Sequence, residues 1–474
     1  MTRIPLLSRP RFGAIAVGLA TGLVAIAAAA CSNGDPIPTI ESGTDGPASE
    51  TPVASDTATE PASTSTTVRP GGSPSATATG TAEATEEPTA TTEVDPLAQL
   101  RPALLSSLTI GLDPGSVGAA LDEIEVVALE LPTEDRDLWV AVTSGSGIYD
   151  LPEPREHVLG VYERVGASWV ELANVTLSSG PTYAELELLA AQYAGASWIA
   201  VNGQTGAHSG TFELLRFDGV ALTSAIWWFS STPAAATIED LDGVEPPEVV
   251  LNATDPYVYC YACGVRAWQE VIYRWVDGQL AEVPLGPVTN DSQVVRDTTE
   301  VAAIYAQADL WQDALDAASE ALALAPDNED VWWLHQLIER VASDRLGDAG
   351  SDPQPFVTNV LAGEYEDAVD LMRPYLPEVA LAADGPLIAA TVAEGETTGA
   401  TATWVLDYTE RALKVEPDRA AAHAARAFGL LLDNPEDWSG ALAEMETALR
   451  LEPQDDFYRE AVEYLFEQNG NAFG

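Results

Sequence analysis

Short apolar runs rich in Val, Trp, Tyr and Thr recur between residues 97 and 290, and polar turn pairs are spaced along them. This pattern predicts short β-strands. One order of pieces recurs three times: a strand, a second strand, then a hairpin with Gly at its turn. The first strands span 124–131, 183–190 and 236–241, the second strands 138–144, 197–203 and 247–253, and the hairpins 161–172, 214–225 and 272–283. Four strands per unit predict an all-β domain, built as a small or incomplete propeller or as a sandwich.

From residue 295 to 474 the hydrophobic period changes to that of helices, and alanine becomes frequent. An Ala or Val is followed at +4 and +7 by small or medium residues and at +12 by proline. Small residues allow two antiparallel helices to approach closely, and proline ends the second helix. Three sets fit this spacing: Ala314, Ala318, Ala321 and Pro326; Val405, Thr409, Ala412 and Pro417; and Ala441, Met445, Ala448 and Pro453.

This spacing resembles the tetratricopeptide repeat, a helix-turn-helix unit that stacks into an all-α solenoid. The family's aromatic residue, three positions before the anchoring alanine, is matched by Trp311, Tyr365 and Trp438. Residues 363–371 match its inter-helix turn, and Gly429 matches its small first-helix position. The resemblance implies repeats at 295–328, 329–380, 386–419 and 420–455, with a closing helix at 456–468. The second repeat departs from the family by an insertion near 347–355 and by Pro374.

Tetratricopeptide arrays bind peptides or proteins on a concave face built from the first helix of each repeat. In that register the resemblance implies a partner-binding groove, in which the arginines hold a carboxylate-bearing segment of the partner. The alternative is that these residues are ordinary solvated or intra-repeat side chains. The groove residues are Trp333, Leu337, Arg340, His423, Arg426 and Asn434.

The N-terminus combines three arginines with an apolar run from Phe12 to Ala30, which is the build of a secretory signal. The run ends in small residues before Cys31, and this arrangement resembles the lipobox of bacterial lipoproteins. The resemblance implies a signal peptide at 1–30 and a lipid on Cys31. The alternative is an uncleaved membrane helix. Both readings place the rest of the chain outside the cytoplasm of a bacterium.

Residues 31–96 consist mainly of Ser, Thr, Pro, Ala, Gly and Glu and contain no aromatic residue. Such a segment buries too little apolar surface to offset its chain entropy, so we predict a disordered stalk. The whole chain carries a net charge of -53, with Lys414 as its single lysine. So acidic a protein repels phosphate backbones, which argues against nucleic acid as a partner.

Cys260 and Cys263 are the other two cysteines, and a local disulfide fits an exported protein. A c-type haem site fails because Gly264 stands where its histidine would be. A thioredoxin-like site requires a helix N-terminus, whereas this pair lies among predicted strands. A zinc site lacks two further ligands nearby.

The acidic stretch 239–248 runs into the second strand of the third unit. It offers Asp240, Asp242 and Glu248 as oxygen ligands. With the hairpin at 272–283 it resembles the FG-GAP and VCBS repeats of extracellular propellers, which open with a calcium loop. The resemblance implies calcium at these three carboxylates. The alternative is a plain acidic turn without a cofactor, because the later ligand positions of the loop hold Val244, Pro246 and Pro247.

No motif for a nucleophile beside a base, a metal cluster or a phosphate loop stands out, so we expect no enzyme. The sequence predicts a lipid-anchored extracytoplasmic adaptor that binds envelope or secreted proteins or peptides through its helical repeats. One alternative is a glycan- or ligand-binding surface lipoprotein that recognises its ligand through the β domain. Another is a secreted hydrolase. Aromatic candidates for the glycan alternative are Trp169, Trp198, Trp227, Trp228 and Trp268.

Overall fold

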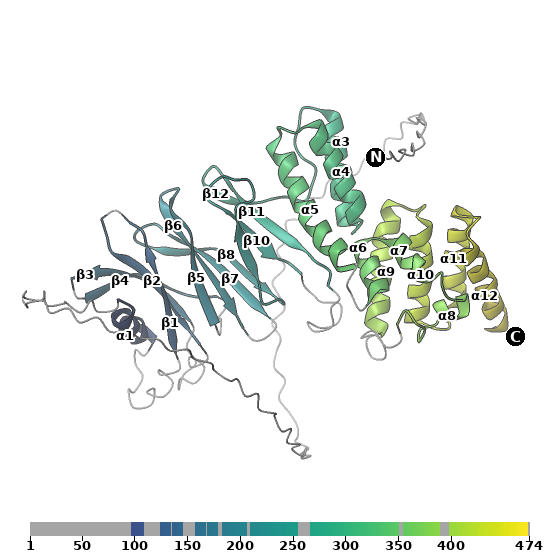
Figure 1. Cartoon of the computed structure of the whole chain (residues 1–474), viewed down its shortest axis with the longest axis horizontal. Helices are drawn as coiled ribbons and strands as arrows, with labels where there is room; N and C mark the ends of the chain where they lie inside the picture. Colours follow the sequence, from purple (N-terminus) through teal and green to yellow (C-terminus); the bar gives the residue numbers. More distant parts are fainter. Residues whose placement is uncertain are drawn as a thin grey trace, which may run out of the picture. The chain divides into compact units, whose positions relative to one another are not determined.

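The computed structural model describes residues 96–108, 124–133, 135–145, 157–166, 168–178, 183–205, 209–254, 266–349, 354–388 and 398–472. Residues Thr89–Gly474 belong to one compact unit. Strands come first along the chain and helices follow, with the change between Glu282 and Gln293 (Figure 1). No helix within the described ranges is long and apolar enough to cross a membrane. The predicted signal peptide, Cys31 and all but the last position of the predicted stalk lie outside these ranges.

The strands of the described residues form three four-stranded antiparallel sheets, none of which closes on itself. Each sheet is a run of consecutive strands, as the repeated order in the sequence predicts. Sheet A contains β1 (Glu125–Leu131), β2 (Leu138–Ser144), β3 (Val158–Val165) and β4 (Ser168–Thr176); sheet B contains β5 (Tyr183–Tyr193), β6 (Ala196–Gln204), β7 (Gly210–Phe217) and β8 (Leu222–Ser230); sheet C contains β9 (Ala236–Glu239), β10 (Glu248–Asn252), β11 (Glu270–Val276) and β12 (Gln279–Glu282).

Successive side chains of a strand point to opposite faces of the sheet. In the second strand of each sheet, both faces are covered by a neighbouring layer, so both sets of side chains are buried. In β6, Ile199 and Val201 share a core with sheet A, whereas Ala200 between them shares a core with sheet C. In β10, Val249 packs toward sheet B and Val250 toward helices. The sheets therefore pack face to face in the order A, B, C.

Helices cover the two outer faces of this stack. The helix α1 (Pro96–Leu108) places Leu100 and Leu104 against Ala141 and Tyr162 of sheet A. At the other end, Ile272 of sheet C shares one core with α3 and α5. Covering both faces keeps the apolar side chains of the end sheets out of water.

The helical region begins with the antiparallel pair α3 and α4 and ends with four long helices. The predicted second repeat contains α5 to α8 instead of two helices, and α7 ends at Asp370, before Pro374. The closing helix predicted at 456–468 is α12. The helices are α3 (Gln293–Gln307), α4 (Trp311–Leu324), α5 (Glu329–Ala349), α6 (Pro355–Ala362), α7 (Tyr365–Asp370), α8 (Pro377–Ala380), α9 (Thr398–Val415), α10 (Ala420–Asp433), α11 (Trp438–Leu451) and α12 (Asp456–Ala472).

The nine non-proline residues of the three spaced sets are buried at helix contacts, and each is at most 1% exposed. Gly429 of α10 shows why small residues are needed, since an added Cβ would lie 2.8 Å from Val405 Cγ1 of α9. The turns before α4 and α7 also resemble each other in backbone conformation. Asp309 before α4 and Gly363 before α7 both adopt positive φ, at 60° and 81°, and an added Cβ on Gly363 would meet the Asp309 carbonyl oxygen at 2.3 Å. The α3–α4 and α6–α7 turns therefore pack directly against each other.

Candidate functional site at the junction of sheet C and the helices

The loop between β9 and β10 brings the three predicted calcium ligands together. One carboxylate oxygen from each of Asp240, Asp242 and Glu248 lies within 4.8 Å of the others. Each carboxylate also shapes the loop by accepting a backbone N–H, from Gly243 at 2.8 Å, Val244 at 2.8 Å and Leu241 at 2.9 Å respectively. The two aspartates are exposed and Glu248 is 2% exposed.

Glu248 is the electrostatically perturbed member of this cluster. Burial, together with the negative charges of Asp242 and Asp240, raises the pKa of its carboxyl to about 7, although the hydrogen bond from Leu241 acts in the opposite direction. A divalent cation would relieve this repulsion. Three carboxylates are hard oxygen ligands, so the residues present fit Ca²⁺, with water as the natural source of its remaining ligands.

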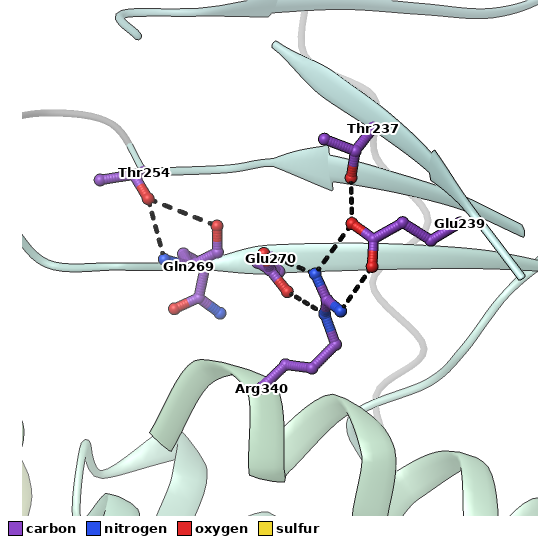
Figure 2. Close-up of polar contacts among 6 residues, drawn as sticks. All are labelled: Thr237, Glu239, Thr254, Gln269, Glu270 and Arg340. Carbon is purple, nitrogen blue, oxygen red and sulfur yellow. Dashed lines mark hydrogen bonds and ion pairs between the residues drawn. The ribbon is translucent and has the colours of Figure 1, made fainter. Parts of the chain in front are cut away.

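The residue before this cluster ties sheet C to the helical region. Glu239 ends β9 and Glu270 begins β11, and both carboxylates hold Arg340 of α5 (Figure 2). Arg340 Nε donates to Glu270 Oε2 at 2.6 Å, and its Nη1 donates to Glu239 Oε2 at 2.9 Å. Two longer bonds from Nη2 complete the contacts, at 3.4 Å to Glu239 and 3.3 Å to Glu270. Thr237 Oγ1 donates to Glu239 at 2.6 Å and so orients that carboxylate.

The charge balance explains why this guanidinium stays ionised. Burial opposes the charged form of Arg340, but the hydrogen bonds and negative charges of Glu270 and Glu239 outweigh it and raise its pKa. The same pairing helps to lower the pKa of Glu239 against its own burial. Arg340 and Glu239 are therefore both charged across the neutral pH range.

A second arginine of α5 is buried more deeply than Arg340, with 4% of Arg345 exposed. Its guanidinium donates to Asp309 Oδ1 at 2.9 Å, to the carbonyl oxygen of Trp268 at 2.6 Å and to that of Leu361 at 2.7 Å. It also donates to Gln269 Oε1 at 3.3 Å. Arg345 thus links the chain before β11 to the α3–α4 turn and to the end of α6.

A third arginine, Arg274 of β11, forms ion pairs with Glu329 and Asp330 at the start of α5, at 2.6 Å and 2.5 Å. The two acidic residues lie at a helix N-terminus, where negative charge is favoured. Arg274 also lies over the Trp333 ring, 5.6 Å from its centre. Three arginines therefore join sheet C to α5.

The structure divides the predicted groove residues into two groups. Trp333 and Leu337 are 2% and 6% exposed and belong to the core shared with sheet C, so little of either side chain is open to a partner. Arg340 is held by the two glutamates. The resemblance to tetratricopeptide arrays could not show this, because the covering sheet comes from outside the helical repeats.

The groove residues of α10 lie apart from this junction. His423 Nδ1 lies 2.6 Å from Glu444 Oε2 of α11, and Arg426 Nε lies 3.3 Å from the other oxygen of the same carboxylate. Burial lowers the pKa of His423, but its hydrogen bonds to Glu444 and the Pro417 carbonyl raise it overall. Asn434 is exposed at the end of α10, where its side-chain oxygen accepts the N–H of Glu436.

The remaining sequence candidates are scattered or outside the described ranges. Cys260 and Cys263 lie in the undescribed segment 255–265, so their predicted disulfide stays a prediction. Among the tryptophans proposed for glycan recognition, Trp198 is 5% exposed and Trp227 of β8 is 51% exposed. Trp228 donates its indole N–H to the Asn252 carbonyl oxygen at 2.8 Å.

Sequence reasoning missed Glu239, Glu270, Asp309 and Arg345 as members of this junction. Their partners lie far away in the chain, so no local spacing points to them. No protein-family model, no curated protein and no solved structure matches this chain. The site therefore rests on its own geometry.

Proposed function

We propose that this protein is an extracytoplasmic, lipid-anchored adaptor that binds other proteins or peptides of the bacterial envelope through a tetratricopeptide-like solenoid. The observation that carries the proposal is the burial of the spaced small residues, such as Ala314, Thr409 and Ala448, at contacts between helices. Arrays of this kind bind partners along their helices. The signal-like N-terminus and Cys31 support the proposed extracytoplasmic, lipid-anchored location.

The β region supports the same proposal as a rigid support for the helices. We interpret its three face-to-face sheets as blades of an incomplete propeller whose outer faces are covered by α1 and by α3 with α5. The arginine contacts at Arg274, Arg340 and Arg345 orient the helical region on the last sheet. In this proposal the protein has no catalytic role.

His423 and Arg426 of α10, two half-buried residues of the predicted groove that lie outside the sheet C junction, are the place to test the adaptor. The full-length chain is used as bait for detergent-solubilised envelope, beside a His423→Ala/Arg426→Ala double variant. We expect one reproducible protein to be captured by the wild type and lost with the double variant, because the imidazole and guanidinium contacts are both removed. Quantitative mass spectrometry of the captured proteins measures the loss.

Arg459→Ala is the matched control, since Arg459 of α12 is exposed and pairs only with neighbouring Asp456 among the described residues. It should capture the same protein as the wild type. Capture that the double variant leaves unchanged would show that α10 is not the binding face. Retention of glycan instead of protein would favour the surface-lectin alternative.

A second candidate function belongs to the β9–β10 loop alone. We propose that Asp240, Asp242 and Glu248 bind calcium, because the fold brings these three carboxylates within 4.8 Å of one another. Calcium bound there would neutralise the charge beside Glu239 and fix the loop that positions it. The ion would then act as a structural brace for the junction.

A further inference from the structure

A cavity of about 500 Å³ lies beside the junction, where the chain before β11 meets α3, α5 and α9. This volume is within the usual range for small-molecule sites, about 300 to 1,000 Å³. The cavity shares only Arg345, Asp309 and Gln269 with the junction already described. On the sheet side its lining includes Ala253, Ala267 and Gln269, and on the helix side the lining is mostly polar or aromatic.

One face of α9 supplies most of the polar and aromatic lining. Trp404, Asp407, Tyr408 and Arg411 stand at i, i+3, i+4 and i+7, so they share one side of the helix. An adjacent face of the helix carries the buried Val405, Thr409 and Ala412 stripe. The two functions of α9 are thus separated on two faces: one packs against α10 and the other faces the cavity.

The wall of the cavity is held in place by a chain of contacts. Arg345 binds Asp309 Oδ1, and Asp309 Oδ2 in turn lies 2.7 Å from Arg411 Nη2. The Arg411 guanidinium lies over the Tyr408 ring at 4.2 Å, and the Tyr408 and Trp404 rings stack at 5.8 Å and 21°. These contacts limit the rotamers of Arg411 and Trp404, so a ligand would meet a preorganised surface.

Several polar groups of this surface have no protein partner within the described part of the chain. They are the exposed carboxylate of Asp407, the Nε group of Arg411 and the side-chain nitrogen of Gln269. The set offers both donors and acceptors. Its formal charge is balanced, with Arg345 and Arg411 against Asp309 and Asp407, while the chain as a whole carries -53 and repels anions.

We propose that this cavity binds a neutral sugar, either free or as one unit of a glycan. The apolar face of a sugar ring would lie on the partly exposed Trp404 ring, and its hydroxyl groups would bond to Asp407, Arg411 and Gln269. Hydroxyls both donate and accept, which matches a mixed set of a carboxylate, a guanidinium and an amide. This inference goes beyond the adaptor and does not rest on it. It also differs from recognition by the tryptophans of the β region.

The test is titration of the full-length chain in detergent with glucose, galactose, mannose, N-acetylglucosamine and trehalose, followed by ligand-observed NMR and calorimetry. We expect at least one of these sugars to bind. Asp407→Ala should then weaken binding at least about tenfold, since a hydrogen bond to a charged group is removed. Because Asp407 is exposed, this variant is expected to keep the fold, and Asp407→Asn provides a second variant of unchanged shape.

Glu410→Ala is the matched control on the same helix, because Glu410 is exposed, pairs with Lys414 and does not line the cavity. It should bind the sugar as the wild type does. Parallel titrations with leucine and glutamate test zwitterionic and anionic ligands. The proposal is overturned if none of the five sugars binds, if Asp407→Ala and Asp407→Asn bind as tightly as the wild type, or if only an amino acid binds.

Discussion

The contacts between sheets and the contact between sheet C and the helices are built differently. Aliphatic and aromatic side chains such as Val201, Phe212 and Leu251 fill the spaces between sheets A, B and C. The junction with the helices has an apolar core too, but Arg274, Arg340 and Arg345 add charged contacts to it. Apolar packing is non-directional, whereas a guanidinium bound by carboxylates fixes an orientation. We infer that the charged contacts set how the helical region is held on the β region.

The largest effect is expected for Arg345→Met, which removes the most buried charge of the junction. We expect a loss of about 3 to 5 kcal/mol in the free energy of unfolding, because Asp309 and two backbone carbonyls lose a buried partner. Urea denaturation followed by circular dichroism measures it. Arg459→Met, at an exposed position of α12, should change stability by less than about 0.5 kcal/mol. A loss no larger than this control would mean that apolar packing alone holds the junction.

The second prediction concerns pH and calcium at Glu248. Its pKa is raised from 4.5 to about 7 in the folded chain, so the folded state binds this proton more tightly than the unfolded state does. The contribution of Glu248 is therefore most favourable below about pH 4.5 and falls as the pH rises toward 7. The full difference corresponds to about 3 kcal/mol. Comparison of the wild type with Glu248→Gln at each pH isolates this contribution.

The same variants can be measured with added calcium. If the ion binds the three carboxylates, it should raise the midpoint of thermal unfolding most at pH above 7, where Glu248 is ionised. Asp242→Asn and Glu248→Gln should lose that response. Parallel pH curves for wild type and Glu248→Gln would contradict the raised pKa, and an equal calcium response in all three chains would place calcium elsewhere.

The smallest expected effect is the coupling between Arg340 and Glu270. Both side chains are partly exposed, at 26% and 14%, so we expect a double-mutant cycle with Arg340→Met and Glu270→Gln to give about 1 to 2 kcal/mol. Salt should reduce this coupling, since partly exposed charges are screened. A packing contact between sheets, tested by Leu214→Val, should show no such salt dependence. A coupling near zero would mean that Arg340 does not help to orient the helical region on sheet C, and that Arg274 and Arg345 do so without it.

Local patterns predicted most of the elements and some of the site. The apolar run in "LWVAVTS" corresponds to β2, and the spacing of Ala441, Met445 and Ala448 identified the buried face of α11. The acidic loop was found because Asp240, Asp242 and Glu248 are close in sequence. The cavity face of α9 was missed although Trp404, Asp407, Tyr408 and Arg411 have helical spacing. The repeat pattern that predicted this helix concerns only the buried stripe on the adjacent face.

Strand and helix periodicity, the four-strand units and the calcium candidates were therefore contained in the sequence, because each depends on neighbours within one element or one turn. The pairing of Arg340 with Glu239 and Glu270, the burial of Trp333 under sheet C and the cavity at α9 were decided only by the tertiary structure. These contacts join residues that are 70 or more positions apart for Arg340, and 36 apart for Arg345 and Asp309. Many arginine–carboxylate pairs are chemically equivalent in so acidic a chain, and only the packing of the sheets and helices selects among them.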